Sequence, residues 1–174
     1  MSIARGCLIR DAAPGVDDDA VATLMVAYLT WAIERLASEH GVDEPPTHPS
    51  LVREGLANYH PPAGRLLLAE CDGQSVGVGA LRTLRTGVVE VKRMYVAPDW
   101  RNRHVGSAIL DRLLDQAGEL GATTVLLDTC RFMTKAQQLY RSRGFVERPP
   151  YEGTEIPPRL QDHWIFFERS KPLG

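Results

Sequence analysis

Apolar residues recur every three or four positions in several stretches of this chain, which is the spacing of one buried face of an α-helix. One stretch begins at three aspartates, Asp17 to Asp19, whose charges favour a helix start. Another runs from Val105 and stops at Gly121, and glycine is a common residue at a helix end. The pattern predicts helices at 17–36, 50–59, 105–121 and 134–143.

Runs of aliphatic and β-branched residues bounded by turn residues predict strands. Asp72 and Gly73 separate two of these runs, and an Asp-Gly pair is typical of a two-residue hairpin turn. A strand, the helix at 105–121 and a further strand follow one another, which indicates a parallel pair joined by a right-handed crossover. The strands are predicted at 7–10, 65–71, 75–82, 88–96, 123–129, 145–147 and 163–168.

This order of elements predicts an α/β fold, in which a mixed sheet carries helices on both faces. The chain of 174 residues is large enough for one hydrophobic core and short of two. We therefore expect a single domain over residues 1–174.

Composition and charge narrow the classes of partner. Hydrophobic residues make up 44% of the chain and charged residues 24%, which is typical of soluble globular proteins. A net charge of −2 gives no overall field that attracts nucleic acid or an anionic membrane, so neither is expected as a partner. The longest apolar run, at 20–33, is shorter than the ~20 residues that a membrane-spanning helix needs.

The cysteines and histidines indicate neither a disulfide nor a metal site. Cys7, Cys71 and Cys130 form no C-x-x-C pair, and an odd count of distant cysteines fits a reducing compartment. The first residues have no secretory pattern, so we expect a cytoplasmic protein. The five histidines lack metal-ligand spacing, and the aspartates at 17–19 fit a solvated helix start, so no metal is expected.

The most informative stretch joins the strand at 88–96 to the helix at 105–121 through a turn that contains Arg101 and Arg103. The first N–H groups of a helix have no partner within it and carry a partial positive charge, so they bind anions. Gly106 has no Cβ atom and lets a ligand approach the backbone closely. The pattern predicts a phosphate site, and the alternative is a solvated basic turn.

Three motifs resemble those of the GNAT family of N-acetyltransferases. Arg103-His104-Val105-Gly106-Ser107-Ala108 is similar to the family signature Arg/Gln-x-x-Gly-x-Gly/Ala, whose loop holds the pyrophosphate of acetyl-CoA. The strand at 90–96 and the later Ala136-x-x-Leu139-Tyr140-x-x-x-Gly144-Phe145 occur at family-like spacing, and the resemblance covers residues 65–145. It implies the GNAT acetyltransferase fold, a mixed and mostly antiparallel twisted sheet with a splayed central parallel pair and helices on both faces.

The resemblance also implies where acetyl-CoA binds as co-substrate. In such proteins a β-bulge in the strand before the signature loop helps to splay the sheet, and acetyl-CoA enters the opening. His104 departs from many relatives, which have glycine at this position. The implied contacts are Met94, Tyr95, Val96, Arg101, Arg103, His104, Val105, Gly106, Ser107, Ala108, Thr129 and Gln137.

Two residues are implied as catalytic. Glu90 interrupts an apolar strand and matches the general base of histone-modifying relatives, which removes the proton that an alkylamine with a pKa near ~10.4 carries. The alternative for Glu90 is an ion pair with Lys92 on the same strand face. Tyr140 matches the general acid for the departing thiolate, and the alternative is a core aromatic residue. Cys130 as a covalent nucleophile is disfavoured, since such relatives transfer the acetyl group directly.

The acceptor is expected to be a primary amine of a small molecule or a peptide. Specificity should come from the first helix and from the loops at 45–49 and 149–162, with Tyr28, Trp31 and Tyr151 as candidate substrate contacts. The favoured function is N-acetyltransfer from acetyl-CoA by direct attack, in a monomer or homodimer. A catalytically silent acyl-CoA-binding or sensing domain is the alternative. A nucleotide-binding protein is disfavoured because the P-loop and dinucleotide glycine motifs are absent from the sequence.

Overall fold

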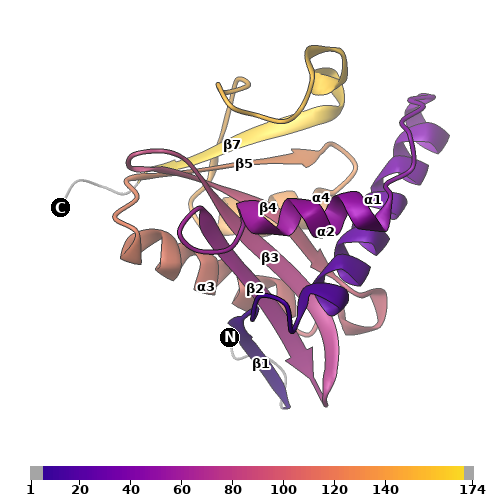
Figure 1. Ribbon diagram of the computed structural model, residues 1–174. Helices are drawn as coiled ribbons and strands as arrows, with labels where there is room; N and C mark the ends of the chain where they lie inside the picture. The colour runs from indigo at the N-terminus through magenta and orange to yellow at the C-terminus, as the bar shows by residue number, and fades with distance from the viewer. Residues whose placement is uncertain (1–5, 171–174) are drawn as a thin grey trace.

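A twisted seven-stranded sheet runs through the structure with strand order β1-β2-β3-β4-β5-β7-β6 (Figure 1). The computed structural model describes residues 6–170, and within them the helices and strands follow the predicted order. The strands are β1 (Cys7–Asp11), β2 (Gly64–Cys71), β3 (Gln74–Arg85), β4 (Val88–Val96), β5 (Thr124–Cys130), β6 (Val146–Arg148) and β7 (Trp164–Ser170). The helices are α1 (Asp18–His40), α2 (Pro49–Gly55), α3 (Val105–Glu119) and α4 (Thr134–Ser142), with short 3-10 helices η1 (Leu56–Asn58), η2 (Pro98–Trp100) and η3 (Pro158–His163).

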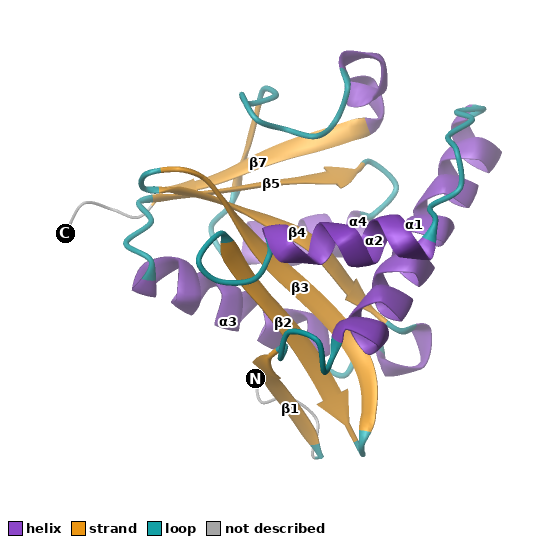
Figure 2. Cartoon of the chain, viewed as in Figure 1, coloured by secondary structure: helices purple, strands orange, loops and turns teal. Residues whose placement is uncertain are grey.

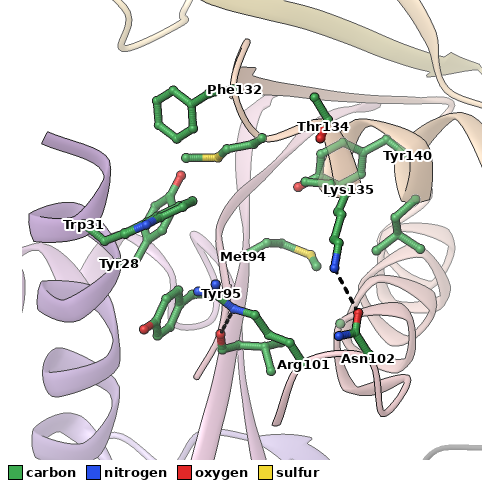
Figure 3. Close-up of a pocket in the computed structure, with 15 residues that line it drawn as sticks. Tyr28, Trp31, Met94, Tyr95, Arg101, Asn102, Phe132, Thr134, Lys135 and Tyr140 are labelled. Carbon is green, nitrogen blue, oxygen red and sulfur yellow. Dashed lines mark hydrogen bonds between the residues drawn. The ribbon is translucent and has the colours of Figure 1, made fainter. Parts of the chain in front are cut away.

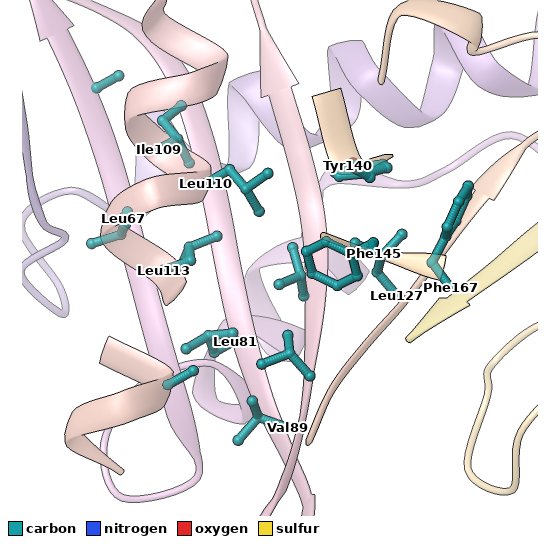
Figure 4. Close-up of a cluster of buried hydrophobic side chains, with 14 of the residues drawn as sticks. Leu67, Leu81, Val89, Ile109, Leu110, Leu113, Leu127, Tyr140, Phe145 and Phe167 are labelled. Carbon is teal, nitrogen blue, oxygen red and sulfur yellow. The ribbon is translucent and has the colours of Figure 1, made fainter. Parts of the chain in front are cut away.

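Helices cover both faces of the sheet, as predicted (Figure 2). Alternate residues of a strand face opposite sides, and in β2 Leu67 joins the core beneath α3, whereas Leu66 and Leu68 join a second core beneath α1. The α3 core also contains Ile109 and, from α4, Tyr140 (Figure 4). The two cores hold α1 and α3 on opposite sides of the central strands.

The central strands β4 and β5 run parallel and then separate. Their pairing ends at Val91↔Leu127, although β4 continues to Val96 and β5 to Cys130. Beyond the paired part the two strands diverge (Figure 2). The splayed parallel pair that the resemblance implied is therefore present, and one edge of β4 faces an opening.

On its other edge, β4 carries the register shift of a β-bulge. Arg93 and Met94 lie opposite the single residue Gly79 of β3, and Arg93 has a φ of +56°. The extra residue changes the alternation of β4, so that Val91 and Met94 both join the α3 core although they are three residues apart. The bulge therefore turns both Lys92 and Arg93 away from α3.

Gly79 also allows α3 to lie close to the sheet. A Cβ atom at this position would lie 2.5 Å from Cγ2 of Ile109 and 3.1 Å from Cδ1 of Leu113. Both distances are shorter than ordinary van der Waals contact between carbon atoms. The glycine thus sets how near α3 approaches β3.

Two of the three cysteines are paired in the structure, although no disulfide was expected. Cys7 and Cys71 lie opposite each other in the antiparallel β1–β2 pair and form a disulfide, whereas Cys130 is free and buried. Their separation of 64 positions hid this pairing, because only the strand register brings them together. The expectation of unpaired cysteines is wrong for this pair, and the cytoplasmic placement that drew on it stays a prediction.

Helix α1 is longer than its predicted range of 17–36 and ends at His40. With 23 residues and a mean hydropathy of 1.3 in its most apolar window, it is the one helix among residues 6–170 that is long and apolar enough to cross a membrane. Length and composition alone are weak evidence, because core helices pass the same test. In this structure, Val21 and Met25 pack in the core beneath the helix. By length and composition, the expectation that this segment is too short to cross a membrane is wrong.

Asp17 precedes α1, but its carboxylate does not cap the helix. It accepts hydrogen bonds from the Arg10 guanidinium at 2.6 and 2.9 Å and from the backbone N–H of Ala13 at 2.7 Å. The hydrogen bond from Arg10 is the main reason that the pKa of Asp17 is lowered to about 2. Asp17 therefore ties β1 to the start of α1.

Candidate active site

A cleft of about 450 Å³ opens where β4 and β5 diverge. One wall comes from α1, with Tyr28 and Trp31, and the opposite wall comes from α4, with Tyr140 (Figure 3). Met94 and Tyr95 of β4 lie between these walls. Segments that are distant in the sequence thus meet at the open edge of β4.

The loop between β4 and α3 forms one end of the cleft. Asn102 and His104 have φ values of +61° and +63°, which is the left-handed region that glycine adopts most easily. The glycine that the resemblance implied at the position of His104 would adopt this backbone conformation without strain. A Cβ atom at Gly106, which lines the cleft, would meet Cγ2 of Val96 at 3.6 Å, an ordinary contact. The protein itself therefore leaves the start of α3 accessible.

Two cations lie at this end of the cleft. Arg101 donates from Nε to the carbonyl oxygen of Val96 at 3.0 Å, and its guanidinium lies 5.4 Å from the ring of Trp31. Lys135, in the first turn of α4, donates from Nζ to Oδ1 of Asn102 at 3.3 Å (Figure 3). Lys135 could not be recognised from the sequence, because only the fold brings the first turn of α4 beside the loop before α3. Arg101 and Lys135 can both contribute charge to an anion site here.

Several of the implied cofactor residues support the loop and do not line the cleft. Arg103 lies over the ring of Trp100 at 4.8 Å, and Val105 is buried in the α3 core. The hydroxyl of Ser107 and the backbone N–H of Ala108 both donate to the carbonyl of His104, at 2.9 and 3.0 Å. Of the segment 101–108, the structure brings Arg101, Asn102 and Gly106 to the cleft.

Thr129 and Gln137 organise the loop between β5 and α4. Gln137 donates from Nε2 to the carbonyl oxygens of Cys130 and Arg131 at 3.2 and 2.9 Å. The hydroxyl of Thr129 donates to the sulfur of Met133 at 3.4 Å. These bonds position Met133, which lines the cleft. The structure thus gives Gln137 a supporting place behind the cleft wall.

Tyr140 packs as a core aromatic residue and also reaches the cleft. Its ring packs against Phe145 and Phe167 at centroid distances of 6.0 and 6.1 Å, as a core aromatic does. It also lines the cleft. Burial, with a smaller effect of the Asp128 charge, raises the pKa of Tyr140, so the phenol keeps its proton. A protonated phenol beside the cleft can serve as a proton donor.

Glu90 is fully buried in a network of charged groups. Its carboxylate accepts hydrogen bonds from Nη2 and Nε of Arg82 at 2.5 and 3.0 Å and from the hydroxyl of Tyr151 at 2.7 Å. The ion pair with Lys92 that the sequence offered as the alternative is present at 3.6 Å. Glu90 does not line the cleft, whose walls include Met94 of the same strand.

Asp128 of β5 lies closer to the opening and was missed from the sequence. It lines a small cavity of about 50 Å³ between the separating strands, together with Met94 and Tyr140 of the cleft. Its Oδ2 lies 3.2 Å from Nζ of Lys92 and 3.3 Å from the hydroxyl of Tyr151. Asp128 and Lys92 each interrupt an apolar strand in the sequence. These two interruptions were the signal from which a buried charged pair could have been predicted.

The candidate substrate residues fall in two places. Tyr28 and Trp31 line the cleft from α1, and Trp31 meets Phe132 edge to face at 5.5 Å. Tyr151 is instead buried against Phe166 at 5.7 Å and bonded to Glu90. The long loop thus contributes a fixed hydroxyl to the charged network.

The described residues offer little to covalent or metal chemistry. Burial, and the charge of Asp128 to a smaller extent, raise the pKa of Cys130 to about 12, so its thiol stays protonated and is a poor nucleophile. Among residues 6–170, no group of three or more His, Cys, Asp or Glu side chains is arranged to hold a metal ion.

Comparison with known proteins agrees with this geometry. Residues 25–145 match the Acetyltransferase (GNAT) family. An IAA acetyltransferase from Azospirillum brasilense is 37% identical over 110 residues, which are 63% of this chain and 68% of that protein. An uncharacterized N-acetyltransferase from Schizosaccharomyces pombe is 33% identical over 112 residues, 61% of this chain and 69% of that protein.

Solved structures share the fold at low sequence identity. A GNAT acetyltransferase from Staphylococcus aureus has a TM-score of 0.72 and 18% identity, over 94% of this chain and 98% of that one. A Salmonella typhimurium protein, described as an acetyltransferase and solved with its cofactor acetyl-CoA, has a TM-score of 0.68 and 16% identity, over 98% of this chain and 96% of that one. The chain therefore belongs to the GNAT family of acetyltransferases.

Proposed function

We propose that this protein transfers the acetyl group of acetyl-CoA to a primary amine of a small molecule or peptide, by direct attack assisted by a general base. The observation that carries the proposal is the cleft at the splayed end of β4, which connects the start of α3 with Tyr140. Acetyl-CoA supplies the acetyl group as an activated thioester.

The residues at the cleft fit acetyl-CoA along its length. The start of α3 offers backbone N–H groups to a diphosphate, and Gly106 places no side chain over them. Arg101 and Lys135 add positive charge at the same end. Further along, β4 is free of β5 beyond Val91, so its backbone groups can pair with the amides of an extended chain.

We assign removal of the amine proton to Asp128, supported by Glu90. Asp128 reaches the gap between the strands, whereas Glu90 lies behind it. The hydroxyl of Tyr151 donates to Glu90 at 2.7 Å and lies 3.3 Å from Asp128. Once Asp128 is protonated, its carboxyl group can donate a hydrogen bond to the Tyr151 oxygen. Glu90 thus acts on the base through Tyr151 and is a positioning residue in this scheme.

Tyr140 is proposed as the proton donor for the departing sulfur. Its phenol faces both the cleft and the small cavity that contains Asp128. Because the raised pKa keeps the phenol protonated, a proton is available at the moment the thiolate leaves.

Release of free thiol with a panel of amines tests this proposal. Asp128→Asn and Tyr140→Phe should each lower kcat by about a hundredfold or more at saturating acetyl-CoA, and Glu90→Gln should lower it less. Acetyl-CoA affinity, measured by titration calorimetry, should stay unchanged in all three. Asp111→Asn is the control, because this exposed carboxylate pairs with Arg143 on the surface. Unchanged turnover in the three variants would reject the assignments.

The alternative of a silent acyl-CoA-binding or sensing domain makes a different prediction. Such a domain would bind acetyl-CoA in the same cleft but release no thiol with any amine. Asp128 and Tyr140 line one small cavity beside the cleft, where a proton acceptor and a proton donor can both reach a bound thioester, and this favours an enzyme.

A further inference from the structure

A second cavity of about 370 Å³ lies on the other side of β4 from α3. It is an open hollow lined by residues of α1, α2 and η1, together with Arg93 of β4 and Glu155 of the loop before η3 (α1, α2 and β4 in Figure 1). The small cavity that contains Asp128 shares Arg93 with this second cavity and shares Met94 with the acetyl-CoA cleft. The three hollows therefore border one another near the bulge of β4.

The bulge explains why a guanidinium lines this cavity. In a regular strand Arg93 would face α3, because Val91 does and side chains alternate. The extra residue places Met94 in the α3 core instead. Arg93 and Lys92 consequently lie on the same side, and both reach Glu155, at 3.4 Å each.

Arg93 is the least compensated cation of this network. The one hydrogen bond of its guanidinium among residues 6–170 is the long contact from Nη2 to Oε2 of Glu155. Glu155 itself has a closer partner, Arg82, at 2.8 Å. A guanidinium carries several N–H donors in one plane, so most of those of Arg93 are available to a ligand in the cavity.

The charges of the network limit the kind of ligand that it can accept. The cations Arg82, Lys92 and Arg93 are balanced by the carboxylates Glu90, Asp128 and Glu155. A ligand with a net charge would leave one charge of this partly buried group uncompensated, which is costly. A zwitterion adds an anion near Arg93 and a cation toward Asp128 and preserves the balance.

Aliphatic side chains form part of the remaining wall of the cavity, beside the polar side chains of Thr47 and Asn58. Met25 and Leu29 line it from α1, and Leu51 and Val52 line it from α2. Contact with these side chains partly removes an aliphatic group from water, which is favourable.

We propose that the acceptor is a free amino acid with an aliphatic side chain. Its carboxylate binds Arg93, its side chain lies between α1 and α2, and its amine points through the gap toward Asp128. This inference rests on the proposed function. The new bond joins the amine nitrogen to the acetyl carbon as the carbon–sulfur bond breaks. Asp128 takes the ammonium proton, and Tyr140 protonates the sulfur and is reprotonated by the nitrogen's second proton.

Matched probes test the role of the carboxylate. Leucine, leucinamide and 3-methylbutylamine share the side chain and the amine, but leucine alone has the carboxylate. We expect kcat/KM for leucine to exceed that for the other two by about tenfold or more, as a charge-assisted hydrogen bond provides. Leucinamide also stands for a peptide N-terminus, so its equal use would favour a peptide acceptor and overturn the inference.

Variants of Arg93 test its assignment. Arg93→Gln should remove the preference for leucine, measured as the ratio of its kcat/KM to that of 3-methylbutylamine, and Arg93→Lys should restore part of this ratio. Arg112→Gln is the control, because this arginine pairs with Glu119 on the outer side of α3. Equal losses for all three probes in Arg93→Gln would overturn the assignment.

A binding measurement keeps this test independent of turnover. Leucine titrated into the protein saturated with CoA should release heat, and Arg93→Gln should weaken this binding by about tenfold or more. If amines are acetylated but leucine neither binds nor reacts, the inference is wrong and the acetyltransferase function stands. If acetyl-CoA itself does not bind, the proposed function fails and the inference fails with it.

Discussion

Replacement of Gly106 by alanine separates the stability of the fold from the binding of acetyl-CoA. Gly106 is the second residue of α3, and a Cβ atom there meets only Cγ2 of Val96 within 4 Å, at 3.6 Å. The protein therefore has room for the methyl group. The space that the methyl group occupies is, however, the space over the first N–H groups of α3, where we place the diphosphate.

The two effects of this substitution have opposite signs. Alanine stabilises a helix relative to glycine by roughly 0.5–1 kcal/mol, which corresponds to a rise in Tm of about 1–4 °C for a domain of this size. Loss of a hydrogen bond to a charged group costs about 1.5–3 kcal/mol, which is an affinity loss of about 10- to 150-fold. A variant that is more stable but binds worse is the expected result.

Thermal unfolding without ligand and titration calorimetry with acetyl-CoA measure the two effects. Gly118→Ala is the matched control, since Gly118 lies in the last turn of the same helix, away from the cleft. It should raise Tm similarly and leave acetyl-CoA affinity unchanged. If Gly106→Ala also binds acetyl-CoA as tightly as the wild type, the diphosphate does not lie over the start of α3 and this part of the account is wrong.

Three further predictions concern stability. Gly79→Ala should lower the free energy of unfolding by about 1–3 kcal/mol in urea denaturation, because the new methyl group overpacks α3; an unchanged midpoint would contradict the close approach. The lowered pKa of Asp17 stabilises the folded state above about pH 4, and this contribution should be lost as the pH falls toward 2. Arg10→Gln should therefore reduce the difference in unfolding free energy between pH 6 and pH 3, and an equal difference would contradict this. Cys7→Ser should cost about 2–4 kcal/mol under non-reducing conditions and little with a reductant present. Free thiols at both Cys7 and Cys71 in the protein isolated from cells would show that the disulfide is absent there.

The sequence was sufficient for the order of elements, because the periodicity of each segment is strong. The crossover helix after Val105 and the hairpin at Asp72 appear within a few residues of their predicted positions. Element ends were less predictable, as α1 shows, because its last turns up to His40 carry few apolar residues. Gly106 and Arg101 were expected to lie together because they belong to one turn and helix start, and both line the cleft.

The charged network could not be predicted in the same way. It depends on which side of β4 each side chain faces, and the bulge at Arg93 changes that side without any local signal in the sequence. Asp128 and Tyr151 reach Glu90 only through the β4–β5 pairing and the folding of a long loop. Lys135 reaches Asn102 in the same non-local manner. Contacts between residues of separate elements can be recognised only once the fold is known.

A crystal structure of the protein with acetyl-CoA tests the central claim most directly. The account predicts the diphosphate at the backbone N–H groups around Gly106 and the thioester between Met94 and Tyr140, where β4 and β5 separate. A diphosphate bound elsewhere, or side chains of the protein filling the gap between these strands, would contradict it.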